Sequence, residues 1–270
     1  MPHAEVAGRR LHYVRQGEGQ PLLLIQGLSA NHLHWGDDFL GLLRDDFEVI
    51  AFDNRGIGHS DRVGEPFTVP DMAADTAGLM DALDLESAHV MGISMGGMIA
   101  QELALEHAER VRTLTLGCTY SGGEGSVLTD ATVVQRLGEL FMSGRTEEAL
   151  RYGFEVNVSP AFAEDPAHFE RVTRIAAELP ASLDILLLQV QAIAAHDTSA
   201  RLPQLRVPTL VIHGSEDQML SVENGRLIAR LVPDARLEVF EGVGHAFWWE
   251  RPERSAELLR EHAAAAAPAQ

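Results

Sequence analysis

A serine flanked by glycines is the residue of this 270-residue chain best placed to attack a carbonyl carbon. It is Ser94, in the stretch Gly-Ile-Ser-Met-Gly at residues 92–96. A serine hydroxyl is a weak nucleophile until a base takes its proton, and the base needs an orienting partner. The spacing fits a tight turn that exposes the hydroxyl, provided that a strand precedes it and a helix follows. The simpler alternative is a glycine-rich connection in which the serine only caps the helix.

Two residues further along the chain are candidates for the base and its partner. Asp217 follows the apolar run 207–213, and His245 lies in the short glycine-flanked loop 242–245. Each also has a plain explanation, since Asp217 could cap a helix near Ser221 and His245 could be an ordinary loop residue. Glu216 competes for the acid role, and we prefer Asp217. Together with Ser94 they predict a nucleophile, acid and base.

The elements around these residues predict that all three meet at one edge of a sheet. Amphipathic helices are expected at about 71–84 and 95–108, and residues 10–15 alternate like an antiparallel strand. Continuous apolar runs typical of strands buried on both faces lie at 21–25, 48–53, 88–93, 111–116, 207–213 and 236–240. Strands that alternate with helices predict an α/β protein with a mostly parallel sheet covered by helices.

This rhythm of strands is interrupted in the middle of the chain. It stops at the glycine-rich stretch 121–125, only helical patterns follow, and strands resume after about residue 203. We therefore expect an inserted helical lid at 122–203 between two parts of one core, 1–121 and 204–270. Most of the large apolar side chains of the lid are expected to lie in its own core, and some of them to face the substrate: Phe141, Met142, Phe154, Phe162 and Leu186–Leu188.

The charge of the chain excludes several classes of partner. Acidic residues number 40 against 21 basic ones, all of them arginine, so the formal net charge is −19. Phosphate backbones and anionic membranes would repel such a chain, which leaves a small-molecule substrate as the expected partner. Without lysine, neither a Schiff base nor a P-loop is possible. The sequence does not predict an oligomeric state.

No cofactor, metal or membrane segment is expected either. Cys118 is the one cysteine, His32 and His34 alone make a weak metal pair, and no dinucleotide-binding glycine pattern follows a first strand. Apolar runs fall well short of the roughly 18 residues of a membrane span, and the first residues do not resemble a signal peptide. We therefore expect a cytoplasmic protein.

On these motifs the chain resembles the α/β-hydrolase superfamily over nearly its whole length. Residues 53–60, Asp-Asn-Arg-Gly-Ile-Gly-His-Ser, are similar to the family's D-x-R-G-x-G-x-S loop, and 207–217 and 244–245 resemble its acid and histidine segments. The resemblance implies the α/β-hydrolase fold with Ser94, Asp217 and His245 as catalytic triad. It also implies a serine hydrolase for a carboxylic ester, lactone or thioester, similar to carboxylesterases and 3-oxoadipate enol-lactonases.

The resemblance further assigns the oxyanion hole to two backbone N–H groups. One is that of Met95, directly after the nucleophile, and the other is that of Leu28. Many relatives have His-Gly-x at the second position, whereas this chain has Gln26-Gly27-Leu28. We expect Gln26 to anchor the loop by hydrogen bonding. The alternative is that its amide contacts the substrate.

Several other functions remain open at this point. Cofactor-free haloperoxidases, perhydrolases and C–C bond hydrolases share the triad, and some hormone receptors use the same scaffold without turnover. Epoxide hydrolases and haloalkane dehalogenases are disfavoured, because they have aspartate in place of Ser94. An enol-lactone substrate would need cations for its carboxylate, and the lid offers five candidates: Arg136, Arg145, Arg151, Arg171 and Arg174.

Overall fold

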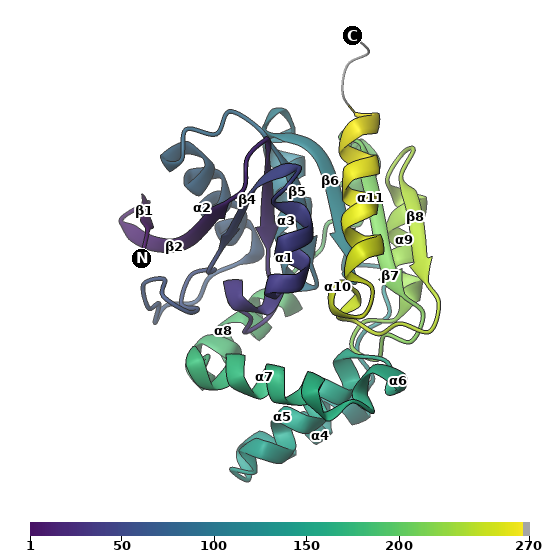
Figure 1. The fold of residues 1–270 in the computed structure, drawn as a ribbon. Coiled ribbons are helices and arrows are strands. Elements are labelled where there is room, and N and C mark those ends of the chain that lie inside the picture. Colours follow the sequence, from purple (N-terminus) through teal and green to yellow (C-terminus); the bar gives the residue numbers. More distant parts are fainter. Residues whose placement is uncertain (267–270) are drawn as a thin grey trace.

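The computed structural model describes residues 1–266, so the last four residues of the expected core segment 204–270 lie outside it. An eight-stranded sheet forms its centre, in the order β1-β2-β4-β3-β5-β6-β7-β8 (Figure 1). The strands are β1 (His3–Val6), β2 (Arg9–Gln16), β3 (Gln20–Ile25), β4 (Phe47–Phe52), β5 (Ala88–Ile93), β6 (Val111–Gly117), β7 (Thr209–Gly214) and β8 (Arg236–Phe240).

The sheet is parallel from β4 through β8, and only β1 and β2 run antiparallel to their neighbours. Every residue of β5 and β7 is buried, because helices cover both faces of these strands. Alternate residues feed two apolar layers, with Leu23 in one and Leu22 in the other. The predicted α/β class and the mostly parallel sheet are confirmed.

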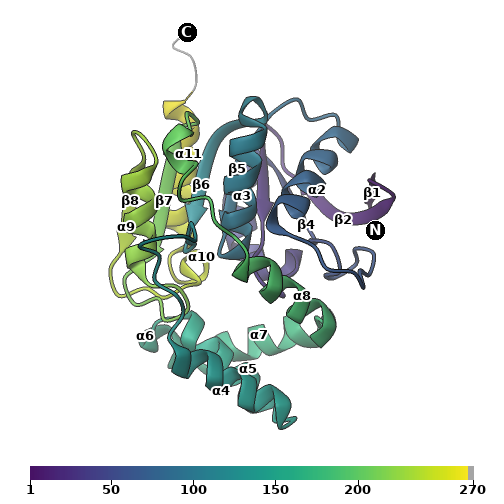
Figure 2. The ribbon, with the colours of Figure 1, turned by 180° about the vertical axis from the view of Figure 1, so that it is seen from behind.

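Helices pack on both faces of this sheet. One face carries α1 (Asp37–Leu43), the short α10 (Phe247–Glu250) and α11 (Pro252–Ala265) (Figure 1). The other carries α2 (Val69–Ala82), α3 (Met95–Glu106) and α9 (Val222–Leu231) (Figure 2). Short 3-10 helices lie at η1 (His32–Trp35), η2 (Ala108–Arg110) and η3 (Leu202–Gln204). Strand β1 and helix α1 were not predicted from the sequence.

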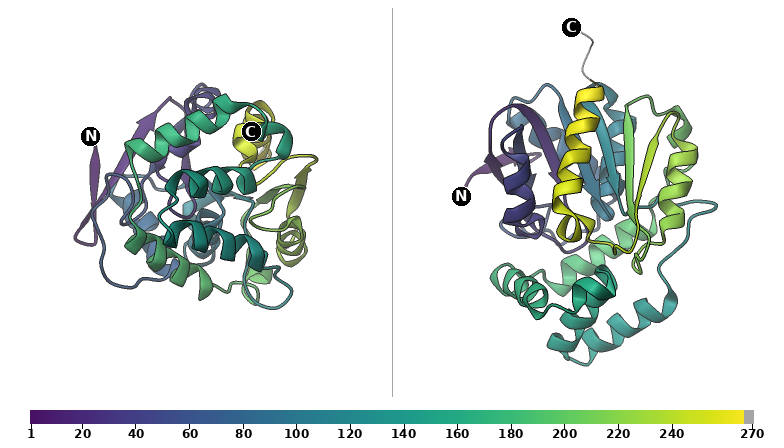
Figure 3. Two further views of the ribbon diagram at one scale, coloured as in Figure 1. Left: turned by 90° about the horizontal axis from the view of Figure 1, so that it is seen from below. Right: turned by 45° about the vertical axis from the view of Figure 1, so that its right-hand side comes forward.

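Five helices follow β6 and precede β7, and they gather at one end of the sheet (Figures 1 and 3). They are α4 (Ala131–Met142), α5 (Thr146–Asn157), α6 (Pro160–Ala163), α7 (Pro166–Glu178) and α8 (Leu183–Ala194). We refer to these five helices as the cap helices. Among residues 1–266 no single helix is long and apolar enough to cross a membrane; only α7 and α8 taken together, bent by 106°, pass that test.

One expectation about the cap helices is wrong for three of the named side chains. Phe154 is buried as expected, but Phe141, Met142 and Leu187 are exposed by 47%, 86% and 58%. Apolar character alone does not predict burial here, because an amphipathic helix can place an apolar residue outside the stripe that its neighbours cover.

Candidate active site

The turn between β5 and α3 has the strained geometry of a nucleophile turn. Ser94 lies at φ 53° and ψ −125°, a region that side chains other than glycine rarely adopt. A Cβ on Gly92 would lie 2.1 Å from the Gly96 oxygen, and one on Gly96 would lie 2.1 Å from the Ile25 oxygen. Glycine is therefore required at both positions. The Ser94 side chain makes no capping hydrogen bond to α3, so capping does not explain this serine.

Asp217 and His245 are brought together by the turns that follow β7 and β8. The distance between His245 Nδ1 and Asp217 Oδ2 is 2.6 Å, and both side chains are buried. The other carboxylate oxygen, Oδ1, accepts the backbone N–H groups of Met219 and Leu220, each at 2.8 Å. Glu216 is exposed, so Asp217 is the acidic residue that reaches the histidine.

The carboxylate of Asp217 is held in its charged form. Burial by itself would raise the pKa of Asp217, but the nearby charge of His245 and hydrogen bonds from His213 and His245 outweigh it, and the pKa falls well below its usual range. In the sequence, His213 is only the last residue of the apolar run 207–213. In the structure, His213 Nε2 lies 2.7 Å from the Leu220 oxygen and 3.2 Å from Asp217 Oδ2.

The turn that carries Ser94 lies directly against the loop after β3. A Cβ on Gly27 would be 3.0 Å from Ser94 Cβ and 3.5 Å from Ser94 Oγ. Within residues 1–266, the N–H groups of Leu28 and Met95 donate no hydrogen bond, so both are free to bind a ligand oxygen. Among residues 1–266, Ser94 Oγ makes no hydrogen bond to His245. The structure therefore links His245 to Asp217 by a hydrogen bond, but not to Ser94.

A buried glutamate that the sequence did not single out ties the histidine loop to the cap helices. Glu250 Oε1 accepts the N–H of Gly244 at 2.8 Å and that of Ser159, the residue before α6, at 2.9 Å. A Cβ on Gly244 would lie 2.5 Å from the Val158 carbonyl carbon. The backbone next to His245 is therefore fixed from both the core and the cap.

Two glutamine side chains hold the loop after β3. Gln26 Oε1 accepts the Gly27 N–H at 3.2 Å, which is the anchoring role expected from the sequence. Gln189, on α8, was not singled out, because a glutamine in a mostly apolar helix matches no motif. Its Oε1 accepts the Ser29 N–H at 2.8 Å.

Two groups of residues in the described part of the chain have metal-ligand types within 4.8 Å of one another: His12, His32 and Asp53, and Cys118, Asp217 and His245. In the first group the Nδ1 atoms of His12 and His32 lie 3.0 Å and 2.9 Å from the Asp53 oxygens. Hydrogen bonds account for this arrangement, which joins β2, η1 and the loop after β4 behind the site. His34 belongs to neither group; its Nδ1 accepts the Asn31 N–H.

Comparison with known proteins identifies the family. A family model described as alpha/beta hydrolase fold matches residues 20–252. A relative from Azorhizobium caulinodans with the provisional name carbamate hydrolase RutD is 31% identical over 96% of this chain and 97% of its own. The 2-hydroxymuconate semialdehyde hydrolase of Pseudomonas putida is 31% identical over 94% and 90%. The enol-lactonase of Burkholderia xenovorans LB400 is 26% identical over 97% and 100%, with a TM-score of 0.85.

The chain therefore belongs to the α/β-hydrolase family, and it is a hydrolase. The names of these relatives indicate different substrates. Membership in the family therefore does not determine which bond this protein cleaves.

Proposed function

We propose that this protein is a serine hydrolase that cleaves a carboxylic ester, lactone or thioester of a small molecule. The observation that carries the proposal is the 2.6 Å hydrogen bond between His245 Nδ1 and Asp217 Oδ2. These residues follow β8 and β7, at the same edge of the parallel sheet as the strained Ser94 after β5. An imidazole whose Nδ1–H is given to a carboxylate keeps the lone pair of Nε2 for a hydroxyl proton. The cap helices would act as a lid over the site.

In the proposed mechanism His245 removes the proton of Ser94 as the serine oxygen attacks the carbonyl carbon. The N–H groups of Leu28 and Met95 bind the oxyanion of the tetrahedral intermediate. His245 then gives the proton to the leaving alcohol or thiol, and an acyl-enzyme remains on Ser94. Water activated by His245 attacks the acyl-enzyme, which releases the acid and restores the serine. Asp217 stays ionised and holds the imidazole in the productive tautomer.

We also propose the partners and the location of the protein. We propose a small-molecule substrate, no nucleic-acid or membrane partner, and a cytoplasmic location. The net charge of −19 supports the first two points, because it opposes binding to polyanionic surfaces.

Hydrolysis of p-nitrophenyl esters from acetate to decanoate tests the proposal. Wild type should release p-nitrophenol, and Ser94→Ala should lower kcat/KM by several orders of magnitude, because the triad acts as a unit. Ser143→Ala, which changes an exposed serine after α4, should keep the wild-type rate. Full activity of Ser94→Ala would refute the assignment of the nucleophile.

C–C bond hydrolysis is the second candidate, because the similar Pseudomonas putida protein carries the name of such an enzyme. The two functions separate when 2-hydroxymuconate semialdehyde and the p-nitrophenyl esters are compared with one enzyme preparation. A kcat/KM for the semialdehyde that exceeds every ester value by 100-fold or more would make C–C cleavage the principal reaction.

A further inference from the structure

Gln189 links a cap helix to the loop of the candidate oxyanion hole. Its side chain is fully buried, and its Oε1 accepts the N–H of Ser29 at 2.8 Å. Ser29 directly follows Leu28, one of the two expected oxyanion donors. Since consecutive Cα atoms are about 3.8 Å apart, the Gln189 amide lies within roughly 10 Å of the Leu28 N–H. Figure 2 shows α8, which carries Gln189, across the end of the sheet.

The hydrogen bond to Ser29 fixes which way this amide points. A backbone N–H can only donate, so the oxygen of the Gln189 amide must face Ser29 and the NH2 group must occupy the other branch. That Nε2 is buried and has no hydrogen-bond partner among residues 1–266. Buried amide donors are nearly always paired in folded proteins, so an unpaired one beside a candidate active site points to a ligand oxygen.

Gln26 repeats the arrangement at the other end of the same loop. Its side chain is 1% exposed, its Oε1 accepts the Gly27 N–H, and its Nε2 also lacks a partner among the described residues. Residues 27–29 thus lie between two side-chain amides, that of Gln26 from the core and that of Gln189 from the cap. The NH2 group of each amide has no hydrogen-bond partner among the described residues.

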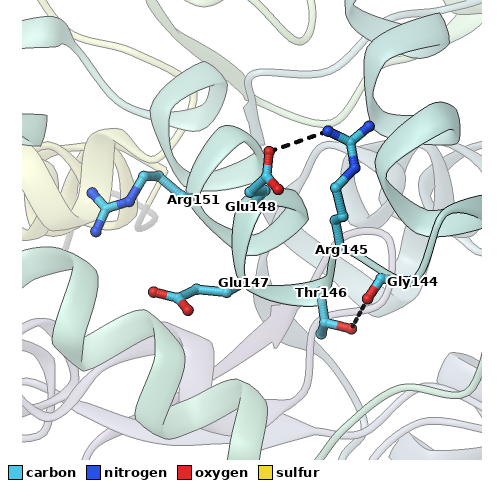
Figure 4. Close-up of a pocket in the computed structure, with 6 residues that line it drawn as sticks. All are labelled: Gly144, Arg145, Thr146, Glu147, Glu148 and Arg151. Carbon is cyan, nitrogen blue, oxygen red and sulfur yellow. Dashed lines mark hydrogen bonds and ion pairs between the residues drawn. The ribbon is translucent and has the colours of Figure 1, made fainter.

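None of the five cap arginines offers a buried, unpaired cation for a substrate carboxylate, which favours a neutral acceptor. The five cap arginines that could have bound a substrate carboxylate are paired with acidic groups, stacked on a ring, or exposed. Their partners are Glu139 for Arg136, Glu148 for Arg145, Asp38 for Arg171 and the Phe169 ring for Arg151, and Arg174 is exposed. Figure 4 shows the Arg145–Glu148 pair in a hollow at the start of α5, which Arg151 also lines.

We propose that the Gln189 NH2 group binds a second carbonyl oxygen on a neutral substrate, with the Gln26 NH2 group as a further donor at the other end of the same loop. The inference rests on the proposed function and narrows its substrate class. The substrate would be an ester or lactone with an amide or keto carbonyl within a few bonds of the carbonyl that Ser94 attacks. An N-acylated α-amino lactone and a 2-oxo ester both belong to this class.

Two lactones that differ in this carbonyl test the proposal. One is N-butanoyl-α-amino-γ-butyrolactone, and the other is α-hexyl-γ-butyrolactone, which lacks the amide. Gln189→Glu keeps an oxygen for the Ser29 N–H but removes the donor, and Gln191→Glu makes the same change at an exposed position of α8. Wild type and Gln191→Glu should prefer the amide-bearing lactone at least tenfold in kcat/KM, and Gln189→Glu should reduce that preference to threefold or less.

The ratio of kcat/KM for the two lactones distinguishes substrate recognition by Gln189 from a purely structural role of this residue. If Gln189 only anchors the cap, Gln189→Glu lowers both rates equally, and the unchanged ratio overturns the proposal. A wild type without preference overturns it too. Gln189→Met, of similar size and without charge, gives the same test if the glutamate variant does not fold. If the enzyme hydrolyses p-nitrophenyl esters through Ser94 but hydrolyses neither lactone, only this substrate class is refuted. If no ester is hydrolysed through Ser94, the proposed function is refuted.

Discussion

At the scale of residues, both carboxylate oxygens of Asp217 are hydrogen-bonded, which keeps the carboxylate from rotating. Oδ1 is held by two backbone N–H groups and Oδ2 by His245, with His213 close behind. A carboxylate fixed in this way determines which imidazole nitrogen carries the proton. The tautomer of His245, rather than its position alone, is therefore the property that Asp217 provides.

Asp217→Asn should retain the fold and lower kcat/KM for p-nitrophenyl esters by about 10³–10⁴-fold, because an amide can hold the wrong tautomer. Glu216→Gln is the matched control and should stay within about twofold of wild type, since Glu216 is exposed. If Glu216→Gln caused the larger loss, the acid would be wrongly assigned.

The pH dependence of kcat/KM follows from the same pair. The pKa of Asp217 is lowered, so its carboxylate stays charged throughout neutral pH and does not limit activity there. The base must be neutral, and an imidazole ordinarily titrates near pH 6.5. We expect kcat/KM to rise across about pH 6–8, measured in buffers of constant ionic strength. A steady fall through that window would contradict a histidine base.

At the scale of elements, the strand–turn–helix unit β5–α3 depends on close backbone approach. Gly92 faces the Gly96 oxygen, and Gly96 in turn faces β3, so the turn that exposes Ser94 also joins two neighbouring strands. The proposed nucleophile and the loop of the proposed oxyanion hole are thus positioned by one set of contacts.

Gly92→Ala should destabilise the protein by about 3 kcal/mol or more, because its Cβ would meet backbone atoms that cannot move aside. Gly138→Ala is the control: it lies in α4 with nothing within 4 Å of the added Cβ, and it should stabilise by roughly 0.5–1 kcal/mol. Urea unfolding measures both changes. Equal stability of Gly92→Ala and wild type would show that the turn is looser than described.

The elements also show what the sequence could and could not predict. Apolar runs predicted β3 through β8, because strands buried on both faces need few polar residues, and the motif at 92–96 predicted the strained turn. The contact of Gln189 with Ser29 joins residues 160 positions apart and has no periodic signature. Helix α1 was missed because its glycine and adjacent aspartates favour a loop by composition.

At the scale of the whole molecule, three histidines link stability to pH: His89 and His196, which are buried, and His34, which is half-buried. Burial lowers the pKa of His34, His89 and His196 to about 4 in the folded protein, whereas an unfolded histidine titrates near 6.5. Between these values the unfolded chain binds more protons. The free energy of unfolding must therefore rise with pH from about 4 to 6.5 and be lost as the pH falls through this range.

We expect a clearly lower Tm at pH 5 than at pH 7, and His196→Leu should reduce that difference. Both ring nitrogens of His196 are buried without a partner among residues 1–266, so a leucine loses no hydrogen bond there. Its share is on the order of 1–2 kcal/mol between the two pH values. Calorimetry at several pH values gives the slope, and a slope unchanged by the substitution would show that His196 is not among the groups responsible.

The central claim is that Ser94 is a nucleophile activated by His245, and covalent labelling tests it most directly. A fluorophosphonate should add once to the wild-type chain, on the peptide that contains Ser94, as read by intact mass and peptide mapping. Ser94→Ala should not be labelled, and His245→Gln should be labelled far more slowly. A wild type that stays unlabelled, or that is labelled at a different serine, would contradict the account.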